Sequence, residues 1–473
     1  MAMLLQDLIP ETTETAEVTG LAVDSRKVKP GFLFAAFPGN QSDGRKFIPQ
    51  AVTAGAKVIL VPRGSALEEI EGVLILEDSN PRLRFADMAA SFYDAQPKWV
   101  AAVTGTNGKS SCVTFIREMW DLLGKQAASL GTLGITAPGL DISGGLTTPD
   151  AAGLHERLAE ITKLGVTHLA MEASSHGLDQ YRMDGVDVRI AAFTNLSRDH
   201  LDYHSNMDEY LKAKERLFSE ILRPGGIAVL NGDAPEFERL TKATDSYGHR
   251  IISYGKKGTD IQLLEVKTTA SGQQLKLIVK DTVFNVTLPL AGYFQVENAL
   301  CSLGVILASK VSAEQAVPLL EKLSGVPGRL EHMGHGVYVD YAHTPDALQT
   351  VLQALRPHTT GNLICLFGCG GDRDKGKRAE MGKIAKQFAD RAIVTDDNPR
   401  SEDAQVIRNE ILATCPNATE ISDRKIAIQT AIQNLESGDV LVIAGKGHET
   451  GQTIGDQVIP FDDRSLAKEC LND

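Results

Sequence analysis

The sequence lacks an excess of basic residues. Its 473 residues include 61 Asp and Glu against 48 Lys and Arg, which gives a formal charge of −13. An acidic chain lacks the basic face that attracts phosphate backbones, so we expect no nucleic-acid partner. Anionic small molecules would have to be held locally, by glycine-loop amides, metal ions and single Arg or Lys side chains.

Long hydrophobic runs are also missing. No apolar stretch reaches the roughly 18 residues that a membrane-spanning helix needs. The start MAMLLQDLIPETTE has no basic segment ahead of its short apolar run, so it does not have the pattern of a secretory signal. We therefore expect no membrane contact.

Paired cysteines are absent as well. The six cysteines lack CxxC spacing, and Cys365 and Cys369 in CLFGC have no histidine nearby. This favours small core side chains over zinc ligands. The pattern fits a protein of the reducing cytoplasm.

The chain has the length and composition of a multidomain α/β protein. At roughly 100–200 residues per domain, two to four domains are expected, and we place three at 1–97, 98–328 and 329–473. The runs GLAVDS, GFLFAAF, AKVILVP and GVLILED predict a small N-terminal α/β domain. After them, apolar strands alternate with helical patterns, which predicts mostly parallel sheets. The stretch 250–290 alternates with period two and predicts antiparallel strands at the edge of the central sheet.

The segment VAAVTGTNGKSS predicts a phosphate site. An apolar strand ends at Gly105, and Gly108, Lys109 and Ser110 open a helix. Backbone N–H groups at such a turn face phosphate oxygens, Lys109 would neutralise the β/γ-phosphates and Ser110 would coordinate Mg²⁺. The loop is shorter than GxxxxGK[ST], because position 103 is Val. The alternative is a chance glycine turn with a surface lysine.

Glu172 ends a buried strand in THLAME and is followed by SSHG. A carboxylate at this position can hold Mg²⁺ opposite a nucleotide. Taken alone, a solvated glutamate at a strand end is the more frequent outcome. The phosphate loop upstream favours the metal interpretation.

Several motifs together resemble one family. TNLSRDHLDYH followed by YLKAKERLF, with TGTNGKSS, resembles the central domain of the Mur ligases. DSR, TTPD, EASSHGLDQYR, PGRLE, DYAHTPDAL, GCGGDRDKGKR, DDNPR and GKGHE narrow the resemblance to the UDP-N-acetylmuramoyl-tripeptide synthetases of that family. The resemblance implies an N-terminal domain for the UDP-muramoyl substrate, a central P-loop ATPase domain, and a C-terminal Rossmann-like domain for the amino acid.

The resemblance also implies a reaction. In this family ATP phosphorylates the D-glutamate carboxylate of UDP-MurNAc-L-Ala-D-Glu, and an amine then attacks the acyl phosphate, in the synthesis of peptidoglycan precursors. Such a site has to neutralise charge where anions meet, so it depends on metal ions and cations more than on a covalent nucleophile. We expect a monomeric, cytoplasmic, ADP-forming ligase.

The family pattern implies two Mg²⁺ ions. Ser110 and Glu172 would hold one, and Glu172, His200 and a Lys214 carbamylated by CO2 would serve the second. Carbamylation turns an ammonium into an anionic oxygen ligand, which a hard cation prefers. Without the resemblance, Lys214 is expected to be a solvated lysine on a helix face. His200 and His204 in RDHLDYH would then be ordinary polar surface.

Further ligand residues carry over from the family by position. The catalytic set is Lys109, Glu172, His200 and Lys214. For ATP they are Gly105, Thr106, Asn107, Gly108, Lys109, Ser110, Ser111, Asn298, Arg329, Asp340 and His343. For the UDP-MurNAc-dipeptide they are Val23, Ser25, Asn40, Gln41, Ser42, Thr147, Thr148, Ser174, Gln180 and Arg182. Leu146 precedes TTPD at a position where relatives have a polar Asn.

DDNPR decides which amino acid is added. Relatives that add meso-diaminopimelate resemble DNPR at this point, and those that add lysine do not. Diaminopimelate has a distal carboxylate, which Arg400 can grip with two parallel hydrogen bonds. In isolation, NPR would be a turn with an exposed arginine. The full set implied for diaminopimelate is Arg373, Asp397, Asn398, Pro399, Arg400, Gly445 and Glu449.

Other functions are compatible with parts of this sequence. Within the same class they are the lysine-adding enzyme, the next ligase of the pathway and folylpolyglutamate synthase. From other classes they are an ATP-hydrolysing switch or assembly protein and a nucleotide-sugar-binding module. The combination of GDRDKGKR, DDNPR and GKGHE with a complete phosphate and metal constellation disfavours them.

Overall fold

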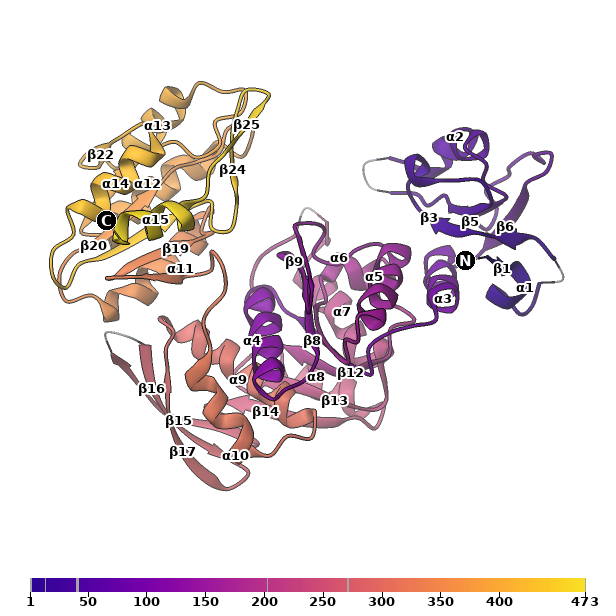
Figure 1. Ribbon diagram of the computed structural model, residues 1–473, viewed down its shortest axis with the longest axis horizontal. Coiled ribbons are helices and arrows are strands. Elements are labelled where there is room, and N and C mark those ends of the chain that lie inside the picture. Colours follow the sequence, from indigo (N-terminus) through magenta and orange to yellow (C-terminus); the bar gives the residue numbers. More distant parts are fainter. Residues whose placement is uncertain (1, 13, 40–41, 202, 270–271, 473) are drawn as a thin grey trace. The chain divides into compact units, whose positions relative to one another are not determined.

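The computed structural model describes residues 2–12, 14–39, 42–201, 203–269 and 272–472 (Figure 1). The chain forms two compact units. One comprises Met1–Ile261 with Cys301–Ser312, and the other Gln262–Leu300 with Ala313–Asp473. Both are α/β structures, as the alternation of apolar strands and helical patterns predicts.

The first unit begins with a four-stranded parallel sheet. Its order is β3-β4-β5-β6 (Gly20–Ala22, Phe32–Ala35, Val58–Pro62, Leu74–Asp78). Helix α3 starts at Pro81, where Oδ1 of Asn80 accepts a hydrogen bond from the Leu83 N–H, a combination of residues typical of helix starts. Besides this sheet, the region contains an antiparallel strand pair, three helices including α3, and two 3-10 turns: β1 (Met3–Leu4), β2 (Glu17–Val18), α1 (Leu5–Leu8), α2 (Ile48–Thr53), α3 (Pro81–Tyr93), Ser25–Lys27 and Gly44–Phe47.

A larger, mostly parallel sheet follows in the same unit. Strands β8, β11, β7, β12, β13 and β14 are parallel neighbours in that order, and β9 and β10 continue antiparallel from β8. Because the parallel strands end at the same edge, the loops after them can meet there. The strands are β7 (Trp99–Thr104), β8 (Ala127–Gly131), β9 (Gly134–Ala137), β10 (Leu140–Ser143), β11 (His168–Glu172), β12 (Val188–Phe193), β13 (Leu222–Asn231) and β14 (Arg250–Gly255).

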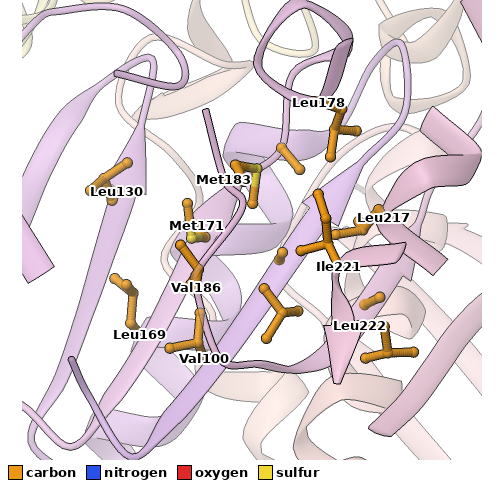
Figure 2. Close-up of a cluster of buried hydrophobic side chains, with 14 of the residues drawn as sticks. Val100, Leu130, Leu169, Met171, Leu178, Met183, Val186, Leu217, Ile221 and Leu222 are labelled. Carbon is orange, nitrogen blue, oxygen red and sulfur yellow. The ribbon is translucent and has the colours of Figure 1, made fainter. Parts of the chain in front are cut away.

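Helices connect these strands. They are α4 (Lys109–Leu122), α5 (Ala151–Lys163), α6 (Ser175–Asp179), α7 (Met207–Arg216), a π-helical turn (Leu217–Ile221) and α8 (Phe237–Asp245). Figure 2 shows part of one apolar cluster, to which Val100, Leu169 and Met171 of β7 and β11 belong together with Leu217 and Ile221 of the π-helical turn and Leu222 of β13. Each such side chain contributes about 1.5–3 kcal/mol when buried. This core fixes the strand ends that carry the site.

The second unit contains a six-stranded sheet in the order β18-β19-β23-β20-β21-β22. All pairs are parallel except β18-β19. The strands are β18 (Glu331–Gly334), β19 (Val337–Asp340), β20 (Leu363–Phe367), β21 (Arg391–Val394), β22 (Thr419–Glu420) and β23 (Val440–Ala444). A separate antiparallel hairpin follows, β24 (Gly451–Ile454) and β25 (Gln457–Pro460).

Helices complete this unit. They are α10 (Ala313–Ala316), α11 (Pro345–Leu355), α12 (Gly376–Phe388), α13 (Ala404–Leu412), α14 (Arg424–Gln433) and α15 (Asp463–Asn472), with 3-10 turns at Val317–Lys322 and Arg356–His358. The unit also holds the antiparallel pair β16 (Gly272–Val279) and β17 (Thr282–Leu288), next to β15 (Ile261–Thr269). Helix α9 (Tyr293–Ala308) contributes residues to both units.

One strand prediction was wrong. The stretch 250–290 was expected to be antiparallel throughout, but β14 pairs parallel to β13. Its side chains from Ile252 to Gly255 are buried, so the strand belongs to the interior of the sheet and not to an alternating edge. Cys365 and Cys369 are buried in the core, as expected. Among the described residues, no helix is both long and apolar enough to cross a membrane.

Candidate active site

The loop between β7 and α4 has the geometry of a phosphate cradle. Gly105 has φ +145° and Gly108, which caps α4, has φ +85°, values that favour glycine. A Cβ on Gly105 would lie 1.9 Å from Oγ1 of Thr194. Lys109 begins α4 and Ser111 is buried in its first turn, so the positive end of the helix opens at this loop.

The segment that follows β12 forms hydrogen bonds with this phosphate loop. The Thr106 N–H donates to the Asn195 carbonyl at 2.8 Å, and the Asn107 N–H donates to Oδ1 of Asn195 at 3.0 Å. Oγ1 of Thr194 donates to the Asn107 carbonyl at 2.7 Å. The TNLS segment therefore shapes the phosphate loop, a role that the sequence did not assign to Thr194 or Asn195.

Glu172 is buried, with 1% of its surface exposed, so the solvated alternative was wrong. Oγ of Ser110 donates to its Oε1 at 2.9 Å, and the Thr132 N–H donates to the same oxygen at 2.9 Å. Oγ1 of Thr132 donates to Oε2 at 3.2 Å. A Cβ on Gly131 would lie 2.2 Å from Oε1. The end of β8 thus makes room for this carboxylate and orients it.

Lys214 on α7 is also buried, with 1% exposed, which overturns its expectation as a solvated lysine. Its Nζ donates to the Gly105 carbonyl at 2.9 Å and lies 4.3 Å from the centre of the Tyr210 ring. Nζ of Lys109 donates to that carbonyl too, at 2.9 Å. Burial, and then the neighbouring Lys109, lower the pKa of Lys214 well below its ordinary 10.5. A buried amine of this kind favours its neutral, nucleophilic form.

A histidine cluster adjoins the same tyrosine. The ring of His200 lies 6.1 Å from Tyr210 and 4.9 Å from His176, and His204 lies 5.1 Å from Tyr210. His200 is exposed, with Nε2 3.6 Å from Oδ2 of Asp199, whereas His204 is buried. Over the residues that the structure describes, no group of three or more His, Cys, Asp and Glu is placed to hold a metal.

Polar residues extend from Glu172 in a continuous network. Oγ1 of Thr148 donates to the Glu172 carbonyl at 3.1 Å, and Oγ of Ser174 donates to Oγ1 of Thr148 at 3.0 Å. Nη1 of Arg182 donates to the Thr148 carbonyl at 2.8 Å and Nη2 to Oε1 of Gln180 at 2.7 Å. Burial lowers the pKa of Arg182. The structure thus brings together four of the residues expected at the dipeptide.

The remaining candidates of this group are more scattered. Oγ1 of Thr147 lies 2.9 Å from Oγ1 of Thr132, beside Glu172. Ser25 is buried and donates to Oε1 of Gln50 at 2.9 Å, while Val23 is half-buried and Ser42 exposed. Asn40 and Gln41 lie outside the described residues. Leu146 is exposed.

In the second unit, Asp340 at the end of β19 shapes a turn. Its carboxylate accepts the N–H groups of Leu330 at 2.6 Å and Ala342 at 2.7 Å. Burial raises its pKa to about 6. The Arg329 guanidinium lies 4.7 Å from the centre of the Tyr341 ring. The loop that carries Arg329 and the turn at Asp340 therefore lie next to each other.

Two other nucleotide candidates have separate partners. Nδ1 of His343 lies 2.8 Å from the Tyr341 carbonyl. Asn298, buried in α9, donates from Nδ2 to Oε1 of Gln295 at 3.1 Å. Neither of these two contacts links His343 or Asn298 to Asp340.

Arg400 is half-buried, so it is not the freely exposed turn arginine of the alternative. Its backbone has φ +52°, and its N–H donates to the Thr453 carbonyl at 3.1 Å. Nη1 donates to the Gly371 carbonyl at 2.7 Å. A Cβ on Gly370 would meet Nη1 of Arg400 at 2.8 Å and Cγ of Arg373 at 3.9 Å. The two arginines therefore flank the glycines that follow β20.

The DDNPR and GKGHE loops meet beside these arginines. Nδ2 of Asn398 donates to Oε2 of Glu449 at 3.0 Å. Gly445 has φ +117°, and a Cβ there would lie 2.7 Å from Oδ2 of Asp397. The Pro399 carbonyl lies close to Gly371. All seven residues predicted for diaminopimelate thus share one loop cluster. This cluster holds both cationic and carboxylate side chains.

Sequence reasoning missed the residues that support this site. They are Thr132, which binds Glu172, Thr194 and Asn195 under the phosphate loop, Tyr210 against Lys214, and Lys446 beside Glu449. Their positions directly after strands, or within the motifs already quoted, were the only signals available.

The fold and the phosphate loop define a nucleotide-binding α/β protein with a P-loop. Three family models match it in succession: residues 17–104 match the catalytic domain of the Mur ligase family, 103–306 the Mur ligase middle domain and 328–447 the glutamate ligase domain of Mur ligases. The chain belongs to the Mur ligase family. The expected three-domain α/β fold and ligase class are confirmed, and the boundaries after residues 97 and 328 stay predictions.

Relatives span the chain from end to end. The UDP-N-acetylmuramoyl-L-alanyl-D-glutamate--2,6-diaminopimelate ligase of Bradyrhizobium diazoefficiens is 48% identical and covers 99% of both chains. The protein of that name from Caulobacter vibrioides is 48% identical, with 100% of this chain and 99% of the relative covered. A solved structure with the same name is 33% identical, with a TM-score of 0.75 and 100% and 99% covered.

Proposed function

We propose that this chain couples meso-2,6-diaminopimelate to UDP-MurNAc-L-Ala-D-Glu, with ATP converted to ADP and phosphate. Full-length similarity to ligases named for this reaction supports it. The observation that carries the choice of amino acid is the loop cluster in which Arg400 flanks Gly370 and Glu449 binds Asn398. That cluster offers one cation for a distal carboxylate and one carboxylate for a distal ammonium.

In the first step, an oxygen of the D-glutamate carboxylate attacks the γ-phosphorus of ATP and ADP leaves. The amides of the Gly105–Ser110 loop and the start of α4 face the phosphates. Lys109, whose Nζ donates to the carbonyls of Gly105 at 2.9 Å and Thr106 at 2.8 Å and so lies at this loop, offers its charge to the β/γ-phosphates. The acyl phosphate that results is the activated carboxyl group.

The donor set fits Mg²⁺. Oγ of Ser110 and Oε1 of Glu172 are 2.9 Å apart, and both are hard oxygen donors. When bound, Mg²⁺ supplies positive charge to the phosphoryl group in transfer. We propose a second ion held by Glu172, His200 and a carbamylated Lys214.

Lys214 fits carbamylation because its amine is buried and its pKa is lowered. The neutral amine attacks CO2, an N–C bond forms, and one proton is released. The product carries an anionic oxygen pair in place of an ammonium. Tyr210, with its ring 4.3 Å from Nζ, holds the side chain at the phosphate loop.

The UDP-MurNAc-dipeptide is proposed to bind along the polar network of the first unit. Thr148, Ser174, Gln180 and Arg182 form its connected part. Hydroxyls, amides and an arginine suit a diphosphate and a peptide carboxylate. The further residues proposed for this ligand are Val23, Ser25, Asn40, Gln41, Ser42 and Thr147.

In the second step, the amine of diaminopimelate attacks the acyl carbon, an amide bond forms and phosphate leaves. Arg400 is proposed to grip the distal carboxylate and Glu449 the distal ammonium. Lysine would leave the half-buried Arg400 without that partner, a penalty that lowers its affinity. The other residues proposed for this ligand are Arg373, Asp397, Asn398, Pro399 and Gly445.

Partners and setting follow from these substrates. ATP and a UDP-linked precursor are intracellular metabolites, so we place the reaction in the cytoplasm. We also propose that the chain acts as a monomer. Asn298, Arg329, Asp340 and His343 are proposed to contact the nucleotide.

Product analysis tests this function. The purified chain with ATP, Mg²⁺, UDP-MurNAc-L-Ala-D-Glu and meso-diaminopimelate should give a UDP-linked product heavier by one diaminopimelate residue, in equal amount to ADP. Each substrate is left out in turn as the control. ADP formed at an equal rate without the amino acid, with no ligated product, would contradict the proposal and favour a nucleotide-hydrolysing switch.

A further inference from the structure

Lys446 lies in the GKGHE loop directly after β23, and its side chain is completely buried. Lysine side chains almost never occur in this environment unless they are paired. Nζ donates to Oδ1 of Asn398 at 3.1 Å, to Oε2 of Glu449 at 3.0 Å and to the Gly451 carbonyl at 2.7 Å. All three protons of the ammonium are therefore used inside the protein, so Lys446 has none left for a ligand.

The three acceptors of Lys446 connect different parts of the amino-acid site. Asn398 belongs to the DDNPR loop, Glu449 to the GKGHE loop, and Gly451 begins β24. Oδ1 of Asn398 also accepts the Thr453 N–H at 2.9 Å. Two donors on Oδ1 fix the orientation of the amide, so that Nδ2 points to Oε2 of Glu449, at 3.0 Å.

This arrangement leaves one carboxylate oxygen of Glu449, Oε1, for a ligand. Oε2 accepts from both Lys446 and Asn398, whereas Oε1 accepts no hydrogen bond from any described residue. The Glu449 side chain is 34% exposed. The buried Lys446 side chain fixes the orientation of the carboxylate through Oε2, so that Oε1 can receive an ammonium group.

The same lysine is tied to Arg400 through the hairpin. The Thr453 carbonyl accepts the Arg400 N–H at 3.1 Å, and the Gly455 N–H donates to the Arg400 carbonyl at 2.8 Å. These bonds hold Arg400 at φ +52°, a conformation that costs a residue with a Cβ about 1 kcal/mol or more. Lys446 anchors the start of this hairpin at Gly451.

We propose that Lys446 is a positioning residue for amino-acid specificity, which sets the spacing between the Glu449 carboxylate and the Arg400 guanidinium. The proposal rests on the function proposed above. A ligand that carries an ammonium and a carboxylate on its distal carbon needs both groups at a fixed separation. A ligand with the ammonium alone gains little from that separation, so Lys446 governs discrimination more than binding in general.

Lys446→Met tests this, because it removes the three donors and keeps the length of the side chain. We expect KM for meso-diaminopimelate to rise about tenfold or more, with KM for ATP unchanged, and the preference over L-lysine to fall by a similar factor. Lys383→Met, an exposed lysine on α12, is the matched control and should leave all three quantities unchanged. A merely structural role would lower the thermal midpoint and kcat and leave the preference intact.

A double-mutant cycle separates positioning from a general loss of packing. If Lys446 acts through Glu449, then Lys446→Met added to Glu449→Gln should cost much less in kcat/KM for diaminopimelate than it costs in the wild type. Additive losses would overturn the proposal. Lys446→Arg is measured as well, since a planar guanidinium cannot reach the same three acceptors, and an unchanged preference in this variant would also overturn it.

The outcomes remain distinct from those of the proposed function. If that function is wrong, the wild-type chain will not respond to diaminopimelate at all. If only the role of Lys446 is wrong, the wild type will respond and the folded variants will keep its preference. Loss of folding in both variants would assign Lys446 to stability and contradict positioning.

Discussion

Oγ of Ser110 donates a hydrogen bond of 2.9 Å to Oε1 of Glu172, which joins the first turn of α4 to the end of β11. These residues are 62 positions apart in the sequence. Their contact places a hydroxyl and a buried carboxylate at the mouth of the phosphate loop. Both oxygens are therefore available to one cation beside the nucleotide.

Glu172→Gln should lower kcat by roughly 100-fold or more, because charge stabilisation at the phosphoryl group is lost, and should raise the Mg²⁺ concentration for half-maximal rate. Initial rates over a Mg²⁺ series measure both effects. Glu238→Gln, an exposed residue of α8, is the control. An unchanged Mg²⁺ dependence in the Glu172 variant would remove this residue from the metal site.

Gly105→Ala should weaken productive ATP binding. Its φ of +145° and the 1.9 Å approach of a Cβ to Oγ1 of Thr194 force the loop to move. We expect KM for ATP to rise about tenfold or more. Gly153→Ala is the comparison, since a Cβ there has ordinary contacts of 3.5 Å or more on helix α5, and it should be neutral or stabilising. Equal ATP affinity in the Gly105 variant would show that the loop conformation is unimportant.

Lys214→Met should stop ligation while the chain remains folded, and a short carboxylic acid should restore part of the rate. ¹³C-labelled CO2 should give a carbamate signal in the wild type that the variant lacks. Lys212→Met, an exposed lysine on the same helix, should keep both the rate and the signal. A wild-type rate independent of CO2, together with no carbamate signal, would contradict carbamylation.

Asp340 predicts a pH dependence of stability. Its pKa is raised from 3.8 to about 6 by burial, so between these values the folded chain binds more protons than the unfolded chain, and stability falls as pH rises. The full cost, about 3 kcal/mol, applies above the folded pKa and disappears below 3.8.

Asp340→Asn removes this titration. The free energy of unfolding of the wild type relative to the variant should therefore decrease by about 3 kcal/mol between roughly pH 3 and roughly pH 7. Denaturant titrations at the two pH values measure the change. A difference that stays constant, or that changes in the opposite direction, would show that Asp340 titrates normally.

Local motifs predicted much of this site because the relevant chemistry follows strand ends. The glycine turn before Lys109 and the loops after β19, β20, β21 and β23 could be identified from apolar runs followed by polar residues. The parallel arrangement of β14 could not be predicted, because a short apolar run has the same pattern at the edge and in the interior of a sheet.

The sequence pattern did not predict which single charged residues are buried. Lys214 lies in KAKERLF, a pattern typical of an exposed helix face, and its burial depends on Gly105 and Tyr210, which pack against it in three dimensions. Thr132 could not be connected to Glu172, because neighbouring strands bring the two together across 40 positions. Such contacts depend on sheet order, which local periodicity does not encode.

The preference for the amino acid tests the central claim most directly. Phosphate release from ATP is measured with UDP-MurNAc-L-Ala-D-Glu and either meso-diaminopimelate, L-lysine or no amine, in the wild type and in Arg400→Met. We predict fast release with diaminopimelate only, and a variant that loses this preference while its KM for ATP is unchanged. Equal wild-type rates with lysine, or a preference that survives in Arg400→Met, would contradict the account.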